Sequence, residues 1–310
     1  MIDHFVWAEK YRPHCVSDCI LPPSLKSIFQ GYVDQKNIPN LILSGGPGTG
    51  KTTVAKAMCE ELDCSYMVID GTRDGDIATI RTKVEPYASS ISWKEGRKYV
   101  IFDEADYLTH KTQPALRNLM EEFASNCGFI LTCNYVSKII EPLQSRCPPI
   151  HFVFKKEDKV KMAMQFYKSV EKMLQTEGVE YDSKVLAALI SKYFPDFRRV
   201  INELQKYASR GKIDVGILSD FTASFKELCG FMKEKNFTSV RKWVADHIDS
   251  EPAHMFRQFY DGASYYFTPK FLPELVLIIA EYSHKAVMCL DQEINMTAFF
   301  VEVMLRAEWI

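Results

Sequence analysis

Short apolar runs alternate with amphipathic stretches through the first half of the chain. Apolar residues recur at helical spacing over residues 54–62, 77–87 and 112–123, which predicts three helices. Between these stretches, runs of β-favouring residues predict strands at residues 41–43, 66–69, 99–102, 129–133 and 150–154. Strands that alternate with helices in this way are typical of a parallel sheet covered on both faces. The pattern therefore predicts an α/β fold for this half.

The pattern changes near residue 155, and no strand alternation follows. Helical spacing covers residues 156–176, 182–193 and 196–209, and Pro195 separates the last two of these stretches. A second helical set runs from about residue 221 to the end. We therefore expect three domains: an α/β domain over residues 1–155, a small helical domain over 156–220 and a helical C-terminal domain over 221–310.

The composition is that of a globular protein, so any nucleic-acid site must be local. The 310 residues are 47% hydrophobic and 25% charged, unlike a disordered or coiled-coil chain. The formal net charge is −2, which does not by itself indicate a nucleic-acid binder. Nine cysteines without zinc-finger spacing favour free thiols in a reducing compartment. With no signal-peptide pattern and no long apolar run, we expect a cytoplasmic protein.

A glycine-rich segment follows the first predicted strand and opens the first predicted helix. Residues 45–52 (GGPGTGKT) match the P-loop pattern GxxxxGK[ST] at every fixed position. Glycines let backbone N–H groups turn toward phosphate oxygens, and the helix N-terminus adds partial positive charge. Lys51 is placed to reach the β- and γ-phosphates of a nucleotide, and Thr52 to put its hydroxyl on Mg²⁺. The alternative is a chance glycine turn, which the strand and helix around it disfavour.

Two adjacent carboxylates end the third predicted strand. Asp103 is expected to hold Mg²⁺ through water, and Glu104 to orient and polarise the attacking water. The following strand ends at Asn134, which we expect beside the γ-phosphate. The alternative is a solvated acidic turn. Together with the P-loop, these residues predict an ATPase site.

Six motifs stand along the chain: WAEKYRP at residues 7–13, GGPGTGKTT at 45–53, DEAD at 103–106, TCN at 132–134, EPLQSRC at 141–147 and FPDFRR at 194–199. In these motifs and their order the chain resembles the AAA+ clamp-loader ATPases over essentially its whole length. It resembles most the large subunits of the T4-like bacteriophage clamp loaders. The SRC element separates clamp loaders from most other AAA+ proteins. The resemblance implies a P-loop ATPase domain, a helical lid and a helical collar over the three expected domains.

The resemblance also implies roles at the nucleotide site. Asn134 matches sensor 1, which helps to place the attacking water, and Arg198 matches sensor 2, which contacts the triphosphate of its own chain. Arg146 matches the arginine finger, which acts on the nucleotide of a neighbouring subunit. For Arg146 and Arg198 the alternative is surface ion pairing. The implied contacts to ATP, including the wrap around adenine and ribose, are Glu9, Lys10, Tyr11, Arg12, Ile20, Gly46, Pro47, Gly48, Thr49, Gly50, Lys51, Thr52, Thr53 and Arg198.

Residues 75–83 resemble the family helix that faces DNA. Arg81 stands at the matching place, and Arg73 and Lys83 are further candidates for phosphate contacts. The stretch 73–76 departs from the family pattern, which leaves these two less defined. The alternative for all three side chains is a solvated charged helix face.

Two further regions carry expectations from the resemblance. Gln113 and Arg117 match the segment that links the ATP site to the DNA-facing helices, although helix capping and packing would explain them equally well. Residues 87–94 match the side that meets the clamp. The apolar stripe over residues 291–305 would serve either as a domain core or as part of the collar that holds subunits together.

The implied function is that of an ATPase subunit of a sliding-clamp loader. Such a subunit binds ATP and Mg²⁺ and works in a hetero-oligomer, expected to be a pentamer, with copies of itself and a smaller subunit. The assembly opens a ring-shaped clamp, grips primer–template DNA and releases the closed clamp when DNA triggers hydrolysis. The rivals are another AAA+ machine, such as a helicase loader or branch-migration motor, and a scaffold subunit without hydrolysis. The presence of Lys51, Glu104 and Asn134 disfavours the scaffold.

Overall fold

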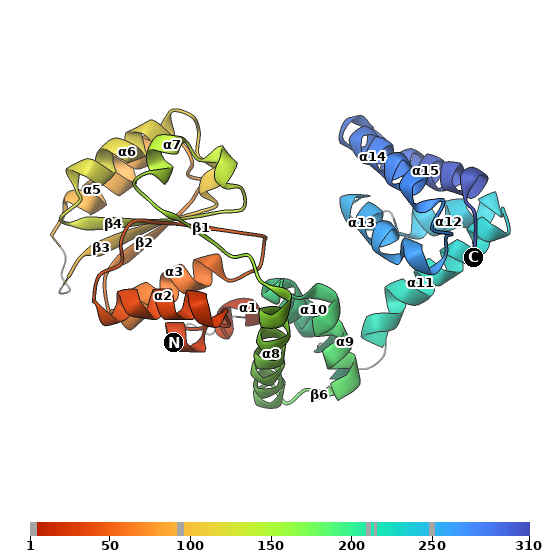
Figure 1. The fold of residues 1–310 in the computed structure, drawn as a ribbon, viewed down its shortest axis with the longest axis horizontal. Coiled ribbons are helices and arrows are strands. Elements are labelled where there is room, and N and C mark those ends of the chain that lie inside the picture. Colours follow the sequence, from red (N-terminus) through yellow and green to blue (C-terminus); the bar gives the residue numbers. More distant parts are fainter. Residues whose placement is uncertain (1–4, 92–95, 209–211, 214–215, 248–251) are drawn as a thin grey trace. The chain divides into compact units, whose positions relative to one another are not determined.

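The computed structural model describes residues 5–91, 96–208, 212–213, 216–247 and 252–310. Its contacts divide the chain into two compact units, Met1–Ile217 and Leu218–Ile310. The first unit holds a parallel sheet with helices on both faces and a further group of helices after it, and the second is helical (Figure 1). The predicted α/β class is therefore confirmed for the first half of the chain.

Five parallel strands form the sheet of the first unit in the order β2-β3-β4-β1-β5. They are β1 (Leu41–Ser44), β2 (Tyr66–Asp70), β3 (Lys98–Asp103), β4 (Cys127–Cys133) and β5 (Pro149–His151). In the register, Ser44 pairs with Cys133 and Asp70 with Asp103, so β1 and β4 end together, as do β2 and β3. Because β4 lies between β1 and β3, the residues that follow these three strands meet at one edge, where parallel sheets bind ligands.

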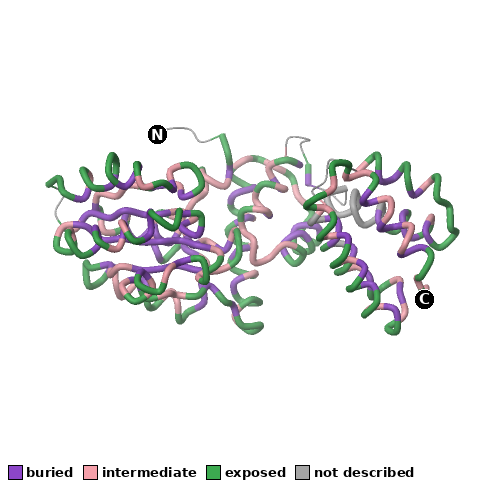
Figure 2. The backbone as a smooth tube through the Cα atoms, turned by 90° about the horizontal axis from the view of Figure 1, so that it is seen from above, coloured by how far each residue is buried: buried purple, intermediate pink, exposed green. Residues whose placement is uncertain are grey.

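Period-two alternation sends side chains of each strand to two separate cores. Leu41 and Leu43 pack on one face of the sheet with α2 (Pro23–Asp34) and α3 (Lys51–Glu61). Ile42 packs on the other face, which α6 (Thr112–Glu122) helps to cover. Figure 1 shows α2 and α3 on one face and α5, α6 and α7 on the other. Figure 2 shows the strands as a mostly buried layer between helices with exposed outer sides.

The remaining elements of the α/β part are short. They are α1 (Trp7–Lys10), η1 (Val16–Asp18), α4 (Ile77–Thr79), η2 (Ile80–Val84), α5 (Glu85–Ser89), η3 (Ala105–Tyr107), η4 (Val136–Lys138) and α7 (Glu141–Gln144). The helix predicted over residues 77–87 is thus a run of α4, η2 and α5, with a π-helical turn in its middle.

The fifth strand is shorter than predicted, because its last apolar residues leave the sheet. The strand was expected to reach residue 154, whereas β5 ends at His151. Phe152 and Phe154 still point into the core beside α2, and Val153 is exposed, so the alternation continues where most of the pairing has ended. The alternation of apolar residues follows the burial of their side chains, and here that burial continues past the last residue of the strand.

Three helices follow the sheet in the first unit: α8 (Lys156–Thr176), α9 (Ser183–Tyr193) and α10 (Phe197–Ala208). Pro195 lies between α9 and α10, as predicted. The pattern did not predict a strand in this region, but β6 (Glu180–Tyr181) pairs in parallel with β7 (Lys212–Ile213). Strands of two residues are too short to give a pattern of alternation.

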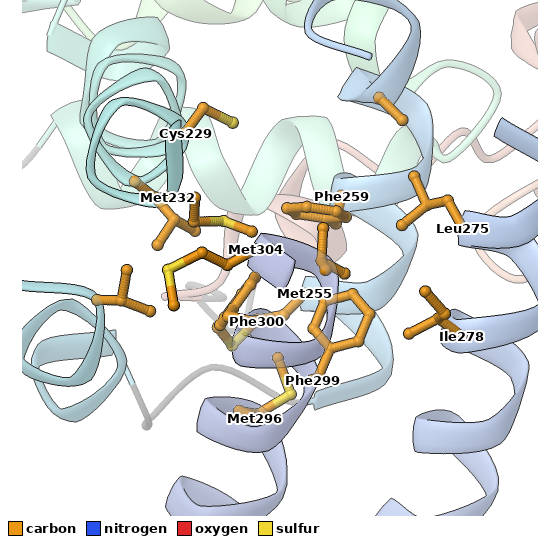
Figure 3. Close-up of a cluster of buried hydrophobic side chains, with 14 of the residues drawn as sticks. Cys229, Met232, Met255, Phe259, Leu275, Ile278, Met296, Phe299, Phe300 and Met304 are labelled. Atoms are coloured by element: carbon orange, nitrogen blue, oxygen red, sulfur yellow. The ribbon is translucent and has the colours of Figure 1, made fainter. Parts of the chain in front are cut away.

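The second unit is helical. It contains most of α11 (Gly216–Lys233), then α12 (Phe237–His247), α13 (Pro252–Gly262), η5 (Ala263–Tyr265), α14 (Leu272–Met288) and α15 (Gln292–Arg306). Figure 3 shows its core, where Phe259, Phe299 and Phe300 meet methionine side chains from several helices. The ring centroids of Phe259 and Phe299 lie 5.3 Å apart in an edge-to-face contact.

The apolar stripe predicted over residues 291–305 is α15, and it is only partly core. Phe299 and Met304 are buried, whereas Ile294 is 66% exposed and Leu305 is 69% exposed. Asp291 caps the helix by accepting a hydrogen bond from the Glu293 N–H at 2.9 Å. Among the described residues, no helix combines the length and apolar character needed to cross a membrane.

Candidate nucleotide-binding site

A cavity of about 780 Å³ lies where β1, β3 and β4 end, and helices α8 and α10 form part of its wall. Pockets for small ligands usually measure about 300–1,000 Å³. Most of the residues predicted to contact nucleotide line it. They are Tyr11, Arg12, Ile20, Pro47, Gly48, Thr49, Gly50, Lys51, Thr52, Thr53, Asp103, Glu104, Asn134 and Arg198.

The P-loop connects β1 to α3 and has the backbone that its glycines allow. Gly48 and Gly50 have φ angles of +68° and +91°, in the left-handed region that glycine adopts without strain. A Cβ on Gly48 would lie 1.8 Å from a carboxylate oxygen of Asp196, so a larger residue there would displace that side chain. Lys51 begins α3, which places the positive end of the helix dipole beside the loop.

Lys51 is buried, and its ammonium group bonds to the loop itself. Its Nζ donates to the carbonyl oxygens of Gly45 and Gly46, each at 2.8 Å, and to Oδ1 of Asn134 at 3.1 Å. Burial lowers the pKa of Lys51, although the nearby Cys133, Asp103 and Asp106 favour its charged form. A phosphate group in the cavity would compensate the burial of this charge.

Oxygen donors suited to Mg²⁺ meet at the ends of β3 and α3. The Thr52 hydroxyl donates to Oδ1 of Asp103 at 2.5 Å, and the Thr132 hydroxyl donates to the same atom at 2.6 Å. Mg²⁺ prefers oxygen ligands and usually keeps waters and substrate phosphates among them. A hydroxyl and a carboxylate at the mouth of the P-loop fit that ion.

Glu104 lines the cavity in an unusual backbone conformation. Its φ is +54°, in the left-handed region that non-glycine residues seldom adopt, and its N–H donates to the Thr132 hydroxyl at 3.2 Å. Burial raises the pKa of Glu104, with further contributions from the charges of Asp103, Asp70 and Asp106. A carboxylate with a raised pKa is better suited to accept a proton from water.

Helices α8 and α10, in the segment expected to form the lid, supply the cavity lining with one predicted residue and several that were not predicted. Arg198 lines the cavity from α10. The N–H of Phe197, in the first turn of α10, donates to the carbonyl of Gly48 at 3.1 Å, so α10 contacts the P-loop directly. Much of the unpredicted lining comes from α8 and includes Phe166, Lys168, Val170, Lys172 and Met173. The apolar members recur at helical spacing, a signal that core packing would produce equally well.

Three residues assigned to nucleotide by the resemblance do not line the cavity: Glu9, Lys10 and Gly46. Glu9 instead accepts hydrogen bonds from the Arg12 guanidinium, which also donates to the Thr53 hydroxyl at 3.1 Å. The carbonyl of Gly46 accepts from Lys51. Glu9 and Gly46 thus bond to neighbours that do line the cavity.

Arg146 lies outside the cavity of its own chain. Its Nε donates to Oε1 of Glu121 at 2.8 Å, and its guanidinium also donates to the carbonyl of Pro142 at 2.9 Å. This partner could not be predicted from the sequence, because Glu121 lies 25 residues before Arg146, in α6. A role for Arg146 in hydrolysis would therefore have to be exerted on another chain.

The three candidate DNA contacts lie on the surface near α4 and η2. Arg81 is exposed, and the Arg73 side chain is 87% exposed, with its Nε 3.7 Å from Asp70. The ammonium of Lys83 pairs with Asp74 at 2.8 Å. Asp76 caps α4 by accepting from the Thr79 N–H. Part of the expected clamp-facing stretch 87–94, namely residues 92–94, lies outside the described residues.

Gln113 is buried and joins two loops at the carboxyl edge of the sheet. Its amide nitrogen donates to the carbonyls of Leu108 and Lys138, at 3.2 and 3.0 Å, and its oxygen accepts from the Ile140 N–H at 2.8 Å. The loops after β3 and after β4 are thus bridged by one side chain. Arg117 bonds to the adjacent Asn118.

Comparisons with known proteins agree with this geometry. The family described as "ATPase family associated with various cellular activities (AAA)" matches residues 41–154, and the family described as "Sliding-clamp-loader large subunit, AAA+ ATPase lid domain" matches residues 158–219. The sliding-clamp-loader large subunit of Enterobacteria phage T4 is 34% identical over 97% of this chain and 96% of its own length. That of Escherichia phage RB69 is 38% identical over 83% and 84%.

More distant relatives extend the comparison. The replication factor C small subunit of Archaeoglobus fulgidus is 36% identical over 76% of each chain. Among solved structures, the RuvB Holliday junction branch migration motor of Thermotoga maritima matches with a TM-score of 0.53 and 18% identity, over 67% of this chain and 70% of that one. This likeness supports the fold alone. The relatives and the site together establish that the chain is an ATP-hydrolysing enzyme and belongs to the sliding-clamp-loader family of AAA+ ATPases.

Proposed function

We propose that this chain is the ATPase subunit of a sliding-clamp loader. ATP binding drives an assembly of subunits that opens a ring-shaped clamp and grips primer–template DNA, and DNA-triggered hydrolysis releases the closed clamp for processive replication. The observation that carries the proposal is that the ATPase residues of a chain of this family gather at one cavity. Lys51, Thr52, Asp103 and Glu104 converge on one cavity that the lid also lines. For a phage protein, this work takes place in the cytoplasm of the infected cell.

Each residue of the site has a separable task. The P-loop and Lys51 bind the phosphates, and Lys51 exchanges its bonds to loop carbonyls for bonds to phosphate oxygens. Glu104 orients the attacking water and accepts its proton, while Asn134 helps to place it. Thr52 and Asp103 would hold Mg²⁺, which neutralises the charge that develops on the phosphate oxygens. Arg198 contacts the triphosphate from the lid, and Tyr11, Arg12 and Ile20 enclose the base and ribose.

Hydrolysis depends on assembly. Arg146 has no access to the cavity of its own chain, so it completes the site of a neighbouring subunit. We propose a hetero-oligomer, a pentamer, that contains copies of this chain and a smaller subunit. Residues 1–155 form its ATPase domain, 156–220 its lid and 221–310 the collar that joins subunits. Arg81, with Arg73 and Lys83, contacts the DNA backbone.

The first test measures ATP hydrolysis by the chain co-assembled with its smaller partner subunit, with and without clamp and primed DNA. The proposal expects a low basal rate that rises at least tenfold when both are present, and no rate above background for Lys51→Ala. An ATPase rate that does not change when the clamp is added would favour a different AAA+ machine. If the wild-type chain hydrolysed ATP no faster than Lys51→Ala, the result would favour a scaffold subunit without hydrolysis and would contradict the proposal.

A further inference from the structure

The N-terminal segment is attached to the lid at two points. The side-chain oxygen of Gln205, on α10, accepts a hydrogen bond from the Trp7 N–H at 2.9 Å, and its side-chain nitrogen donates one to the carbonyl of Phe5 at 2.7 Å. Glu177, the residue at the C-terminal end of α8, accepts hydrogen bonds from the ammonium of Lys10 at 2.8 Å and from the hydroxyl of Tyr11. The segment and the lid are therefore joined although more than 160 residues separate them in the chain.

The same segment is also attached to the P-loop helix. The guanidinium of Arg12 donates to the Thr53 hydroxyl on α3 at 3.1 Å and is held in place by Glu9. The segment thus spans from the lid to α3 within a few residues. Tyr11 and Arg12 line the nucleotide cavity between these two attachments.

The contact at Glu177 is a charge-assisted one. The side chain of Glu177 is 19% exposed and that of Lys10 is 38% exposed, so solvent screens this ion pair in part, whereas the bond from Tyr11 is more protected. Hydrogen bonds from Lys10 and Tyr11 lower the pKa of Glu177, so its carboxylate stays ionised at neutral pH. Burial, together with the bond to this carboxylate, raises the pKa of Tyr11 to about 12, so the phenol remains a donor. Hydrogen bonds to charged groups are stronger than those between neutral groups.

We infer that Glu177 is a positioning residue of the nucleotide site: it holds Lys10 and Tyr11 against the lid and thereby fixes the wall formed by Tyr11. The inference rests on the proposed ATP site. It gives Lys10 a task other than direct contact with nucleotide, in keeping with its place outside the cavity lining. If the lid moved away, Glu177 would move with it and Tyr11 would no longer be held in the cavity wall. The inference therefore expects nucleotide to be retained only while Glu177 remains bonded to Lys10 and Tyr11.

The test measures release of a fluorescent ADP analogue from the full-length chain. Glu177→Ala should speed release about tenfold, as expected when a hydrogen-bonded charge is lost. Glu177→Gln, whose amide oxygen still accepts from Tyr11, should have a smaller effect. Adding Tyr11→Phe to Glu177→Ala should add nothing, because both changes remove the same contact. The KM for ATP should rise with little change in kcat.

Glu180→Gln is the matched control, because Glu180 is an exposed carboxylate on β6, close in sequence to Glu177. It should leave release unchanged. Wild-type release from Glu177→Ala, or independent effects of the two changes in the double variant, would overturn the inference. So would a nucleotide-free melting temperature that falls in step with the faster release, since that indicates a purely structural role. If the wild-type chain bound no analogue, the inference and the proposed ATP site would both fail.

Discussion

At the scale of single residues, Glu104 combines two features that suit the role in hydrolysis proposed for it. Its left-handed backbone turns the chain sharply after β3, directly after Asp103. Its burial, and after that the acidic side chains around it, raise its pKa, which would make it a stronger base. The sequence predicted its role from position alone, but the conformation depends on the loops that pack around β3 and β4.

Glu104→Gln should leave nucleotide binding intact and slow hydrolysis by about 10²–10⁴-fold, the usual worth of a general base. As the pH is lowered, the wild-type hydrolysis rate should begin to fall at a higher pH than it would if Glu104 had the usual pKa of a glutamate, because the pKa of Glu104 is raised. Below that pKa the carboxyl is protonated and cannot accept a proton. The measurement is single-turnover hydrolysis by the assembled complex from pH 4.5 to 8. A wild-type rate for the variant at neutral pH would remove Glu104 from this role.

At the scale of elements, the sequence predicted the strands and long helices well, and it missed contacts between distant segments. The strands at the sheet centre are nearly continuous apolar runs because both faces are buried. Glu177 and Glu121 carry no local signal, and the spacing of the apolar residues of α8 does not distinguish a cavity wall from core packing, since the partners are far away in the chain. The pair β6 and β7 was missed because two residues cannot display a period.

The element that best tests the C-terminal core is α15. Phe299 is fully buried among aromatic rings of three helices, so Phe299→Ala should destabilise the second unit by about 3–5 kcal/mol. Hydrogen exchange of α15 amides in the full chain measures this loss. Phe237→Ala is the control, because Phe237 is 48% exposed and should cost well under half as much. Equal effects of the two changes would contradict the packing described for this core.

The exposed face of α4 and η2 tests the DNA assignment. Arg81→Glu should weaken binding of primer–template DNA to the assembled complex by a similar factor for all sequences. It should also reduce the slope of log affinity against log salt by about one, as expected for one lost phosphate contact. Fluorescence anisotropy at several salt concentrations gives both values. Lys159→Glu is the charge-matched control on the exposed side of α8. If both variants gave the same change, only overall charge would be acting.

At the scale of the whole molecule, the proposed function divides catalysis between chains. The chain carries a phosphate-binding site and an arginine that lies outside it, paired with Glu121. A guanidinium supplied in trans is worth about 10³–10⁵ in rate for phosphoryl transfer. An isolated chain should therefore be a poor ATPase, and assembly should switch hydrolysis on.

Mixing variants tests this division. Lys51→Ala subunits have a defective site and an intact finger, and Arg146→Ala subunits have the reverse. Each alone, with partner subunit, clamp and primed DNA, should be nearly inactive. Mixed before assembly, some interfaces combine an intact site with an intact finger, and part of the ATPase rate should return. No recovery in complexes shown to contain both variants would argue against action in trans.

The bond between the Phe197 N–H and the Gly48 carbonyl has a mechanical consequence. It fixes the first turn of α10 to the phosphate loop, so this end of the helix acts as a fulcrum. The 12 residues of α10 extend about 18 Å from it at about 1.5 Å per residue. A tilt of about 10° at the loop would therefore displace the far end of α10 by about 3 Å. A small rotation of α10 about this bond would thus produce a larger displacement at the far end of the helix.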